Sequence, residues 1–166
     1  MKNLVLFGYD GVLVDNLVRD QKKIRSAYRQ FAKRDIAPFQ DTLTGLKALN
    51  RAGMTLGIVT TQCEAMVNAF CQQFSLRVLI PNTHMRTDVL DKQCAIRSIL
   101  APSRFDAYHT FYVGRQADDI GAANEANVWS VVLQRDKRFR YLRKKQIPDY
   151  DISGMEVLVR LLVAHK

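Results

Sequence analysis

The sequence predicts an α/β protein with a Rossmann-like, three-layer sandwich fold and a mainly parallel sheet. Short apolar runs alternate with segments of helical periodicity, and this order is typical of a parallel sheet with helices on both faces. Several of the runs end at a glycine or a threonine, where a strand gives way to a loop. A length of 166 residues, with 48% hydrophobic and 25% charged residues, fits one globular domain over residues 1–166 and excludes a disordered or fibrous chain.

The first part of the chain contains two predicted strands and two predicted helices. Residues 2–9 form a short apolar run, as expected of a buried strand. Residues 16–33 place apolar side chains at helical spacing among many charged ones, which predicts a solvated helix. Asp41 and Thr42 offer N-caps for a second helix, and Gly53 offers a C-terminal stop. Residues 54–60 then form the next buried strand.

The middle of the chain continues the alternation. Residues 64–74 are predicted to be helical, and residues 77–80 to form a short strand. A polar loop is expected over residues 81–88. Residues 90–100 place apolar side chains on one helical face, which predicts a further helix.

The last third adds two more strands around a helix. Residues 110–113 and 129–133 are short apolar runs, and the helix is expected over residues 119–127. We expect Tyr112 and Trp129 to lie in the core, because both belong to these apolar runs.

The composition limits the setting in which the protein works. Basic residues outnumber acidic ones by 25 to 16, and the formal net charge of +9 raises the question of an anionic partner. The three cysteines form no CxxC pair, which fits reduced thiols. No apolar stretch reaches the roughly 18–20 residues of a membrane span, and the first residues lack the features of a secretory signal. We therefore expect a cytoplasmic protein that does not interact with membranes.

Polar residues follow three of the predicted strands, where an α/β protein builds its ligand site. They are Asp10, the pair Thr60 and Thr61, and the segment 114–119. In this context LVLFGYDGVLVDN, GIVTT, DVLDKQCAI and YVGRQADDIGAANEANV resemble, in order, the four motifs of the haloacid dehalogenase-like (HAD) hydrolase superfamily. The end of the chain, PDYDISGMEVLVRLL, resembles that family's terminal strand and helix, so the resemblance covers most of the sequence.

The resemblance implies roles for the retained residues. Asp10 matches the aspartate that protonates the leaving group and activates water. Thr60, with Thr61 beside it, matches the hydroxyl that holds a phosphoryl oxygen. Lys92 matches the ammonium group that neutralises the nucleophile and the phosphate.

Two positions depart from the family pattern. Gly8 stands where active relatives have the nucleophilic aspartate, and Arg115 where they have a magnesium-binding aspartate; the later aspartate of that motif matches Asp119 or its neighbour Asp118. Glycine cannot form an aspartyl-phosphate. Arginine has five donors and no lone pair, so it cannot ligate magnesium. The sequence therefore predicts a degenerate active site with no resident cofactor.

The remaining charges suggest how such a site is stabilised. The hypothesis is that Arg115 takes the place of the cation and pairs with Asp10 or Asp119. Thr60, Lys92 and the N–H groups that follow the first strand would then still bind a phosphate or sulfate.

Purely structural interpretations of the same residues stay open. Asp10 can be a turn residue, and Thr60 can satisfy a backbone group at a strand end. Asp118 and Asp119 can be helix caps, and Lys92 can be a solvated helix residue.

Residues 16–40 leave room for only a short helical insert between the first two motifs. Relatives with a substrate-selecting cap often insert a long helical domain there. With little or no cap, the resemblance implies an open site, which goes with a macromolecular substrate or with an oligomer whose neighbouring copy closes the site.

Positive charge is densest between residues 135 and 145, where two aromatic residues lie among the cations. The cations are Arg135, Lys137, Arg138, Arg140, Arg143, Lys144 and Lys145. Such a run is typical of a solvated loop, a solvated helix or an interface, and this is the simpler interpretation. The alternative is a surface for an anionic partner, with the aromatic rings stacking on bases.

The predicted function is that of a pseudo-phosphatase: a HAD-fold binding or interaction module that works as a homo-oligomer or with a protein partner and binds a phosphate-bearing ligand. One alternative is a weak magnesium-dependent phosphohydrolase that acts on a phosphomonoester through Asp10 and Asp119, with water as nucleophile. A second alternative is a nucleic-acid-binding protein that uses residues 135–145.

Overall fold

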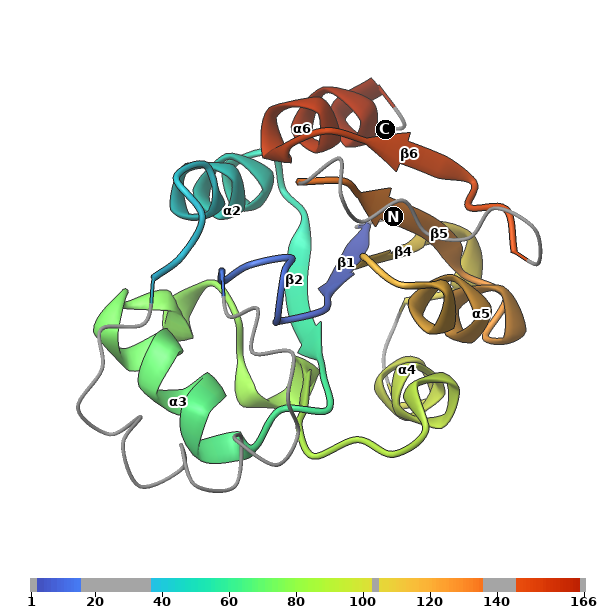
Figure 1. The fold of residues 1–166 in the computed structure, drawn as a ribbon, viewed down its shortest axis with the longest axis horizontal. Helices are drawn as coiled ribbons and strands as arrows, with labels where there is room; N and C mark the ends of the chain where they lie inside the picture. Colours follow the sequence, from blue (N-terminus) through green and yellow to red (C-terminus); the bar gives the residue numbers. More distant parts are fainter. Residues whose placement is uncertain (1–2, 16–36, 103–104, 136–145, 165–166) are drawn as a thin grey trace.

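The computed structural model describes residues 3–15, 37–102, 105–135 and 146–164. These residues form a six-stranded sheet in the order β3-β2-β1-β4-β5-β6, and every described strand pair is parallel. Helices cover both faces of the sheet (Figure 1). The predicted three-layer α/β fold is confirmed.

Most of the predicted elements are present, with small shifts of their ends. The strands are β1 (Leu4–Phe7), β2 (Thr55–Val59), β3 (Met85–Arg86), β4 (Thr110–Gly114), β5 (Trp129–Leu133) and β6 (Tyr150–Ile152). The α-helices are α2 (Thr42–Arg51), α3 (Glu64–Gln73), α4 (Lys92–Leu100), α5 (Ala117–Glu125) and α6 (Met155–Ala164). Three short 3-10 helices are η1 (Leu76–Val78), η2 (Asn82–His84) and η3 (Ala107–His109).

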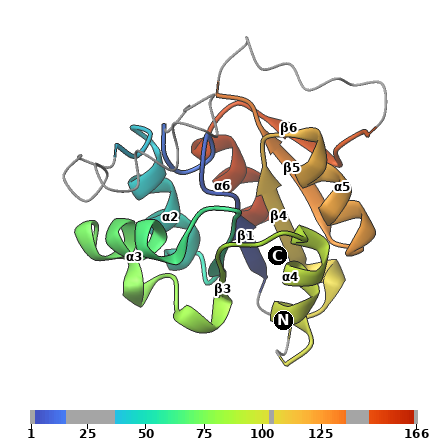
Figure 2. The same ribbon diagram turned by 60° about the horizontal axis from the view of Figure 1, so that its bottom comes forward.

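The two faces of the sheet are covered by different helices and form separate cores. Apolar side chains of α2, α3 and α6 pack against one face. Those of α4 and α5 pack against the other face. Figure 2 shows α2 and α3 on one side of the strands and α4 and α5 on the opposite side.

The first apolar run has no alternating polar residues, because it forms β1 in the centre of the sheet. All four residues of β1 are fully buried, because helices cover both of its faces. Phe7 pairs with Ile58 of β2 and with Val113 of β4. The segments that follow β1, β2 and β4 therefore leave the sheet side by side at its carboxyl edge.

The strand predicted at residues 77–80 is wrong. This segment is mostly helical turn, and it buries Leu76 and Ile80 completely while Val78 is 90% exposed. Side chains four residues apart share one face of a helical turn, whereas a strand would alternate its faces. The edge strand is instead β3, inside the predicted loop, where Met85 pairs with Ile58.

Two further expectations differ from the structure or lie outside it. The predicted helix at residues 16–33 lies outside the described residues. Trp129 is 36% exposed at the start of β5, so the expectation that it lies in the core is wrong. Tyr112, by contrast, is 1% exposed and lies in the core as expected.

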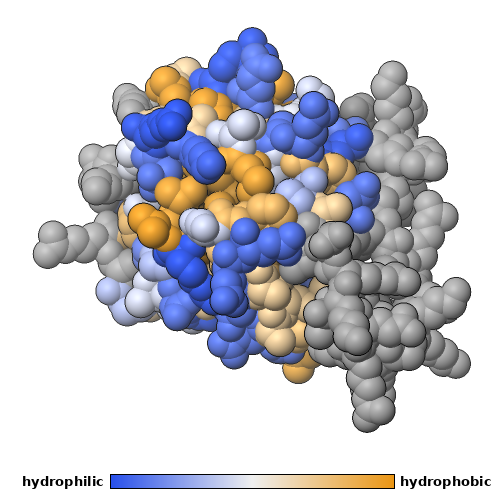
Figure 3. Space-filling view, turned by 90° about the vertical axis from the view of Figure 1, so that its left-hand side faces the viewer, coloured by the Kyte–Doolittle hydropathy of each residue, from blue (hydrophilic) through white to orange (hydrophobic). Residues whose placement is uncertain are grey.

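The surface over α2 and α3 has a mixed character. Figure 3 shows apolar atoms gathered in the middle of this face, with hydrophilic residues around them. Leu43 and Phe74 are partly buried against the core, and Val78 is exposed. The longest described helices have ten residues, and no helix in the described part of the chain has the length and apolar character to cross a bilayer.

Candidate functional site

The carboxyl edge of the sheet brings the predicted site residues together. Asp10 follows β1, Thr60 follows β2, and Arg115 follows β4. Since β1 lies between β2 and β4, these residues leave three neighbouring strands at one edge. Lys92 joins them from the first turn of α4, through contacts with the start of α5.

The Asp119 carboxylate accepts more hydrogen bonds than any other described side chain of the site. Its side chain is almost fully buried, and its Oδ1 accepts hydrogen bonds from Lys92 Nζ at 2.6 Å and from the Tyr112 hydroxyl at 3.2 Å. Its Oδ2 accepts from the main-chain N–H groups of Arg115 at 2.8 Å and Gln116 at 2.9 Å. Four donors therefore fill the roughly four lone-pair directions of one carboxylate.

The local sequence explains why the Asp119 carboxylate folds back onto the strand end. Asp119 and Gln116 form a capping box at the start of α5. Gly114 leaves room for this turn, because a Cβ added there would lie 2.6 Å from Asp119 Cγ. Asp118 and Asp119 therefore lie within the first turn of α5 rather than at its N-cap, which is Gln116, although Asp119 does cap the helix from inside and also binds Lys92.

Lys92 bridges α4 and α5. Its ammonium group contacts Asp118 Oδ2 at 2.7 Å as well as Asp119 Oδ1. Burial by itself would lower the pKa of Lys92, but the two carboxylates raise it above its ordinary value. Burial would likewise raise the pKa of Asp119, whereas Lys92 and the two main-chain N–H groups hold it below its ordinary value. Lys92 is therefore a charged, partly buried residue rather than a solvated one.

The Arg115 side chain lies against the loop that follows β1. A Cβ added to Gly11 would lie 2.7 Å from Arg115 Cδ and 2.9 Å from Cζ. Gly11 also has φ +70°, a left-handed conformation that favours glycine. The guanidinium group is thus directed at the loop that carries Asp10.

Asp10 is half-buried and incompletely bonded. Its Oδ1 is buried and has no hydrogen-bond partner among the described residues. Burial raises the pKa of Asp10 above its ordinary value, while the Gln62 side chain and the Arg115 cation act in the opposite direction. The charge of Arg115 therefore acts on Asp10, one of the two carboxylates predicted to pair with it. The oxygens of the other carboxylate, Asp119, are engaged by Lys92, Tyr112 and main-chain donors.

Gly8, which the resemblance matches to the nucleophile, directly follows β1. Its N–H donates to the main-chain oxygen of Val113 at 2.9 Å. A Cβ added to Gly8 would lie 3.4 Å from Val12 Cγ2, its nearest neighbour, which is ordinary van der Waals contact. Among the described residues, the N–H groups of Tyr9 and Asp10 donate to no backbone carbonyl.

The two threonines at the end of β2 differ in their surroundings. Thr60 is 4% exposed, and its hydroxyl accepts a hydrogen bond from the Gln62 N–H at 3.1 Å. Thr61 is exposed. Thr60 therefore satisfies a loop N–H, as its structural interpretation proposed, and also lies at the carboxyl edge where the resemblance places a phosphoryl ligand.

The side chains at the positions that the resemblance matches to metal ligands do not fit magnesium, the ion that the fold family implies. Position 8 offers no side-chain oxygen, and position 115 offers a cation. Both oxygens of Asp119 are engaged by donors. The Oδ1 of Asp10 is a carboxylate oxygen without a hydrogen-bond donor among the described residues, but a single oxygen does not make a site for a cation that prefers six.

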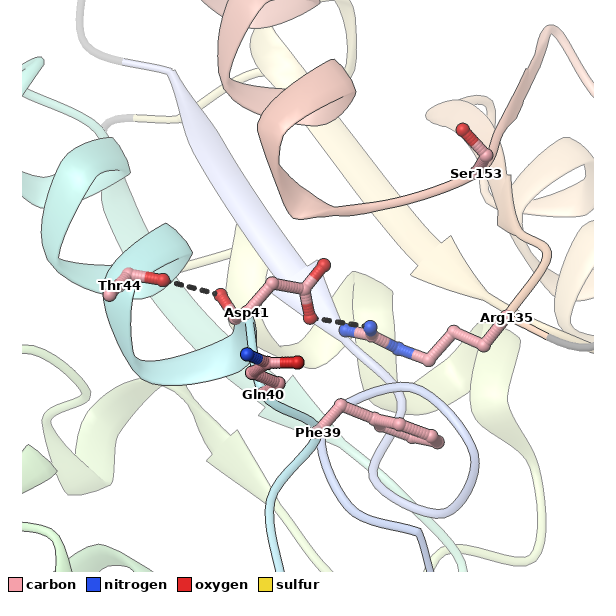
Figure 4. Close-up of a pocket in the computed structure, with 6 residues that line it drawn as sticks. All are labelled: Phe39, Gln40, Asp41, Thr44, Arg135 and Ser153. Carbon is pink, nitrogen blue, oxygen red and sulfur yellow. Dashed lines mark hydrogen bonds and ion pairs between the residues drawn. The ribbon is translucent and has the colours of Figure 1, made fainter.

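Arg135 is the one member of the basic run in the described residues, and it is held inside the fold. Its guanidinium contacts Asp41 Oδ1 at 2.5 Å and the Val12 main-chain oxygen at 2.9 Å, and it lies 4.1 Å from the centre of the Phe39 ring. Figure 4 shows this side chain directed at Asp41 beside Phe39, in an open pocket of about 620 Å³. The other cations of the run lie outside the described residues.

Tyr112 and Asp41 are two residues of this edge whose polar contacts the sequence did not reveal. Tyr112 lies in an apolar run that predicts burial and gives no sign of a polar contact. Asp41 was expected to cap its own helix, but its Oδ2 accepts from the N–H of Met155 at 2.9 Å, at the start of α6. Both contacts join segments that are far apart along the chain.

Solved structures of similar shape include phosphatases and a haloacid dehalogenase-like hydrolase. A predicted phosphatase from Clostridium acetobutylicum is 14% identical over 99% of both chains, with a TM-score of 0.77. A haloacid dehalogenase-like hydrolase from Streptococcus pneumoniae is 15% identical over 96% of this chain and 98% of its own, with a TM-score of 0.73. At such identities the likeness concerns the fold alone.

Another similar structure contains ligands. It is the 3-deoxy-D-manno-octulosonate 8-phosphate phosphatase from Moraxella catarrhalis, in complex with magnesium, phosphate and KDO. It is 18% identical over 99% of this chain and 87% of its own, with a TM-score of 0.70. A comparison with curated protein sequences gives no significant match.

The sequence profile of the haloacid dehalogenase-like hydrolases matches residues 5–133. Apart from Leu4, this range contains all four motifs and the strands from β1 to β5. The sequence match, the parallel sheet and the residues gathered at its carboxyl edge agree with one another. The chain therefore belongs to the haloacid dehalogenase-like hydrolase family.

Proposed function

We propose that this HAD-fold protein is a pseudo-phosphatase: it does not carry out aspartyl-phosphate chemistry and acts as a cytoplasmic binding or interaction module. The observation that carries the proposal is the position of Arg115, whose side chain lies over Gly11 beside Asp10. A fixed cation there neutralises a half-buried carboxylate without a metal ion. Gly8 supports the same conclusion, because it offers no side chain that could take up a phosphoryl group.

An anion site is part of the proposal. Within the described parts of the chain, the N–H groups of Tyr9 and Asp10 at the end of β1 donate to no backbone carbonyl, and the Thr60 hydroxyl and the Lys92 ammonium group lie at the same edge of the sheet. Successive N–H groups with a nearby cation can bind an oxyanion. The charges of Asp10, Arg115, Lys92, Asp118 and Asp119 sum to −1, from two cations and three carboxylates, so we expect binding to be weak.

Turnover of an aryl phosphate tests the loss of catalysis. Wild type is expected to give no hydrolysis with or without magnesium, because both the nucleophile and the metal ligand are missing. The Gly8→Asp, Arg115→Asp double variant restores both carboxylates and is expected to gain magnesium-dependent turnover. The same double variant with Asp10→Ala is the matched control and should lose that gain.

One outcome would overturn the proposal in favour of the alternative enzyme. Magnesium-dependent turnover by wild type that Asp10→Ala abolishes would make the protein an active phosphohydrolase. Turnover that Asp10→Ala leaves unchanged would indicate a contaminating phosphatase. Wild type and the Asp10→Ala variant would then be purified further and assayed again, until their activities differ or both are inactive.

Calorimetric titration with inorganic phosphate tests the anion site. Thr60→Val removes the hydroxyl at constant size and should weaken binding severalfold, whereas Thr44→Val changes an exposed hydroxyl on α2 and should not. Equal affinity in wild type and both variants would contradict a site at the end of β2.

An apolar side chain beside the site supports a macromolecular partner or a second copy of the chain. Leu90 is fully exposed two residues before Lys92. If a second copy covers this edge, sedimentation should show an oligomer that Leu90→Ser weakens. Val163→Ser changes an exposed apolar side chain on α6 and should leave the oligomer unchanged. A monomer at all concentrations would contradict self-association.

A further inference from the structure

A second pocket lies at the amino edge of the sheet, opposite the candidate functional site. It has a volume of about 720 Å³. Its walls come from η3 just before β4, from the start of β5, from the residue before β6 and from the end of α5. Because the strands are parallel, their starts share the edge that faces away from Asp10, Thr60 and Arg115.

Aromatic side chains are exposed in this pocket and yet held in place. Tyr108 is 81% exposed and Trp129 is 36% exposed. The Trp129 ring stacks on Phe111 with the ring centres 6.4 Å apart, and its Nε1 donates to the main-chain oxygen of Tyr108 at 2.9 Å. The Tyr150 ring packs beside it at 5.9 Å. One part of the indole is therefore anchored on the fold, and the exposed part is a preformed apolar surface for a ligand.

A carboxylate is fixed beside the aromatic rings. Asp149 Oδ2 accepts hydrogen bonds from the N–H and from the hydroxyl of Ser130, both at 2.7 Å. The N–H of Asp149 donates to the same hydroxyl at 3.0 Å. All hydrogen bonds that the described residues donate to this carboxylate go to Oδ2, which leaves Oδ1 for a ligand.

The charge of the pocket differs from that of the whole chain. The protein has a net charge of +9, but no lysine or arginine lines the pocket in the described part of the chain. Asp149 supplies a negative charge, and the side-chain oxygens of Asn124 and Asn127 add neutral acceptors. Such a lining disfavours phosphates and carboxylates and favours a cation with several hydrogen-bond donors.

We propose that this pocket binds the guanidinium group of an arginine side chain on a partner protein. A guanidinium is planar, stacks on aromatic rings and donates to carboxylate and amide oxygens, whereas an ammonium group is a compact, strongly hydrated point charge. The pocket offers a fixed indole, a carboxylate oxygen and amide oxygens to such a group. A free amino acid fits less well, because no cation in the described lining pairs with its α-carboxylate.

Tryptophan fluorescence tests the pocket directly, because Trp129 is the single tryptophan of the chain. The probe is N-acetyl-arginine amide, titrated into the protein, with calorimetry as a second readout. We expect saturable binding with a Kd of about 1 mM, since a single side chain makes few contacts. N-acetyl-lysine amide and free arginine should each bind severalfold more weakly.

Two variants locate the bound group. Asp149→Asn removes the charge and keeps an oxygen that can accept from Ser130, and Tyr108→Leu removes an exposed ring whose main-chain oxygen still accepts from Trp129. Each should weaken binding of the arginine probe about fivefold or more. Asp151→Asn is the matched control: Asp151 is exposed on β6 outside the pocket, and its loss should change the affinity less than about twofold. If Asp149→Asn does not fold, Tyr108→Leu decides the location.

No change in emission and no heat with the arginine probe would overturn the proposal. Equal affinities of the arginine and lysine probes would also overturn it, because the pocket would then select charge alone. Tighter binding of free arginine would assign the pocket to a small molecule and overturn the partner protein. The result is independent of the proposed loss of catalysis and of the anion site, because these concern the opposite edge of the sheet and are measured with other ligands.

Discussion

Arg115 and Gly11 are complementary in shape. The arginine side chain fills the space in which any other residue at position 11 would place its Cβ, 2.9 Å from Arg115 Cζ. The glycine also adopts φ +70°, so both its conformation and its contact favour the absence of a side chain. The loop after β1 therefore accommodates the side chain of Arg115.

Gly11→Ala should destabilise the protein more than an alanine at another left-handed glycine. Gly53 has φ +83° and no atom within 4 Å of an added Cβ, so Gly53→Ala should cost only the backbone strain, about 1–2 kcal/mol. Gly11→Ala adds the overlap with Arg115, which we expect to cost about 1–3 kcal/mol more. Urea unfolding measures both values, and equal losses would show that Arg115 does not fill the space over Gly11.

Asp10 and Asp119 should affect stability in opposite directions. The folded protein raises the pKa of Asp10, so ionisation of Asp10 opposes folding. The contribution of protonated Asp10 to stability is fully present below the unfolded pKa and is lost as pH rises through the folded pKa. The folded protein lowers the pKa of Asp119, so its contribution is present above the unfolded pKa and is lost as pH falls through the folded pKa.

Isosteric amides test this difference between the two carboxylates. At pH 7, Asp10→Asn should raise the free energy of unfolding, whereas Asp119→Asn should lower it by about 3 kcal/mol, because it breaks a buried ion pair. Unfolding curves at pH 7 and pH 3.5 measure both effects, and each difference from wild type should shrink at the lower pH. A destabilising Asp10→Asn would mean that Asp10 is better paired than its contacts indicate.

The two buried tyrosines next to Gly8 should respond oppositely to loss of the hydroxyl. The Tyr9 hydroxyl is buried without a hydrogen-bond partner among the described residues, so Tyr9→Phe should raise the free energy of unfolding by about 1 kcal/mol. The Tyr112 hydroxyl bonds Val59 and Asp119, so Tyr112→Phe should lower it by about 1 kcal/mol. Chemical denaturation of the two variants measures both signs, and a shared sign would contradict this difference in hydrogen bonding.

Arg135 should contribute more to stability than an exposed arginine. Arg135→Met removes the contacts with Asp41, Val12 and Phe39, and we expect a loss of about 2 kcal/mol. Arg160→Met is the control: Arg160 is exposed on α6, its contact with Glu156 is 3.9 Å, and the change should stay within about 0.5 kcal/mol. Similar effects of the two variants would show that Arg135 acts as a surface cation.

Local patterns predicted most of the fold. Short apolar runs identified β1, β2, β4 and β5, because a strand covered on both faces needs apolar side chains along its length. The failure at residues 77–80 has the same origin, since a short apolar run fits a buried helical turn as well as a strand. Only the pairing of Met85 with Ile58 decided where the edge strand lies.

The sequence by itself determined the order of the motifs and the chemistry of the residues at positions 8 and 115. Gly8 has no side chain and Arg115 has no lone pair whatever the fold does with them. The tertiary structure alone decided that Arg115 lies over Gly11, that Tyr112 crosses β1 to reach Val59, and that Arg135 is held by Asp41. Residue chemistry is a local property, whereas each of these contacts joins strand ends or loops that only the parallel sheet brings together.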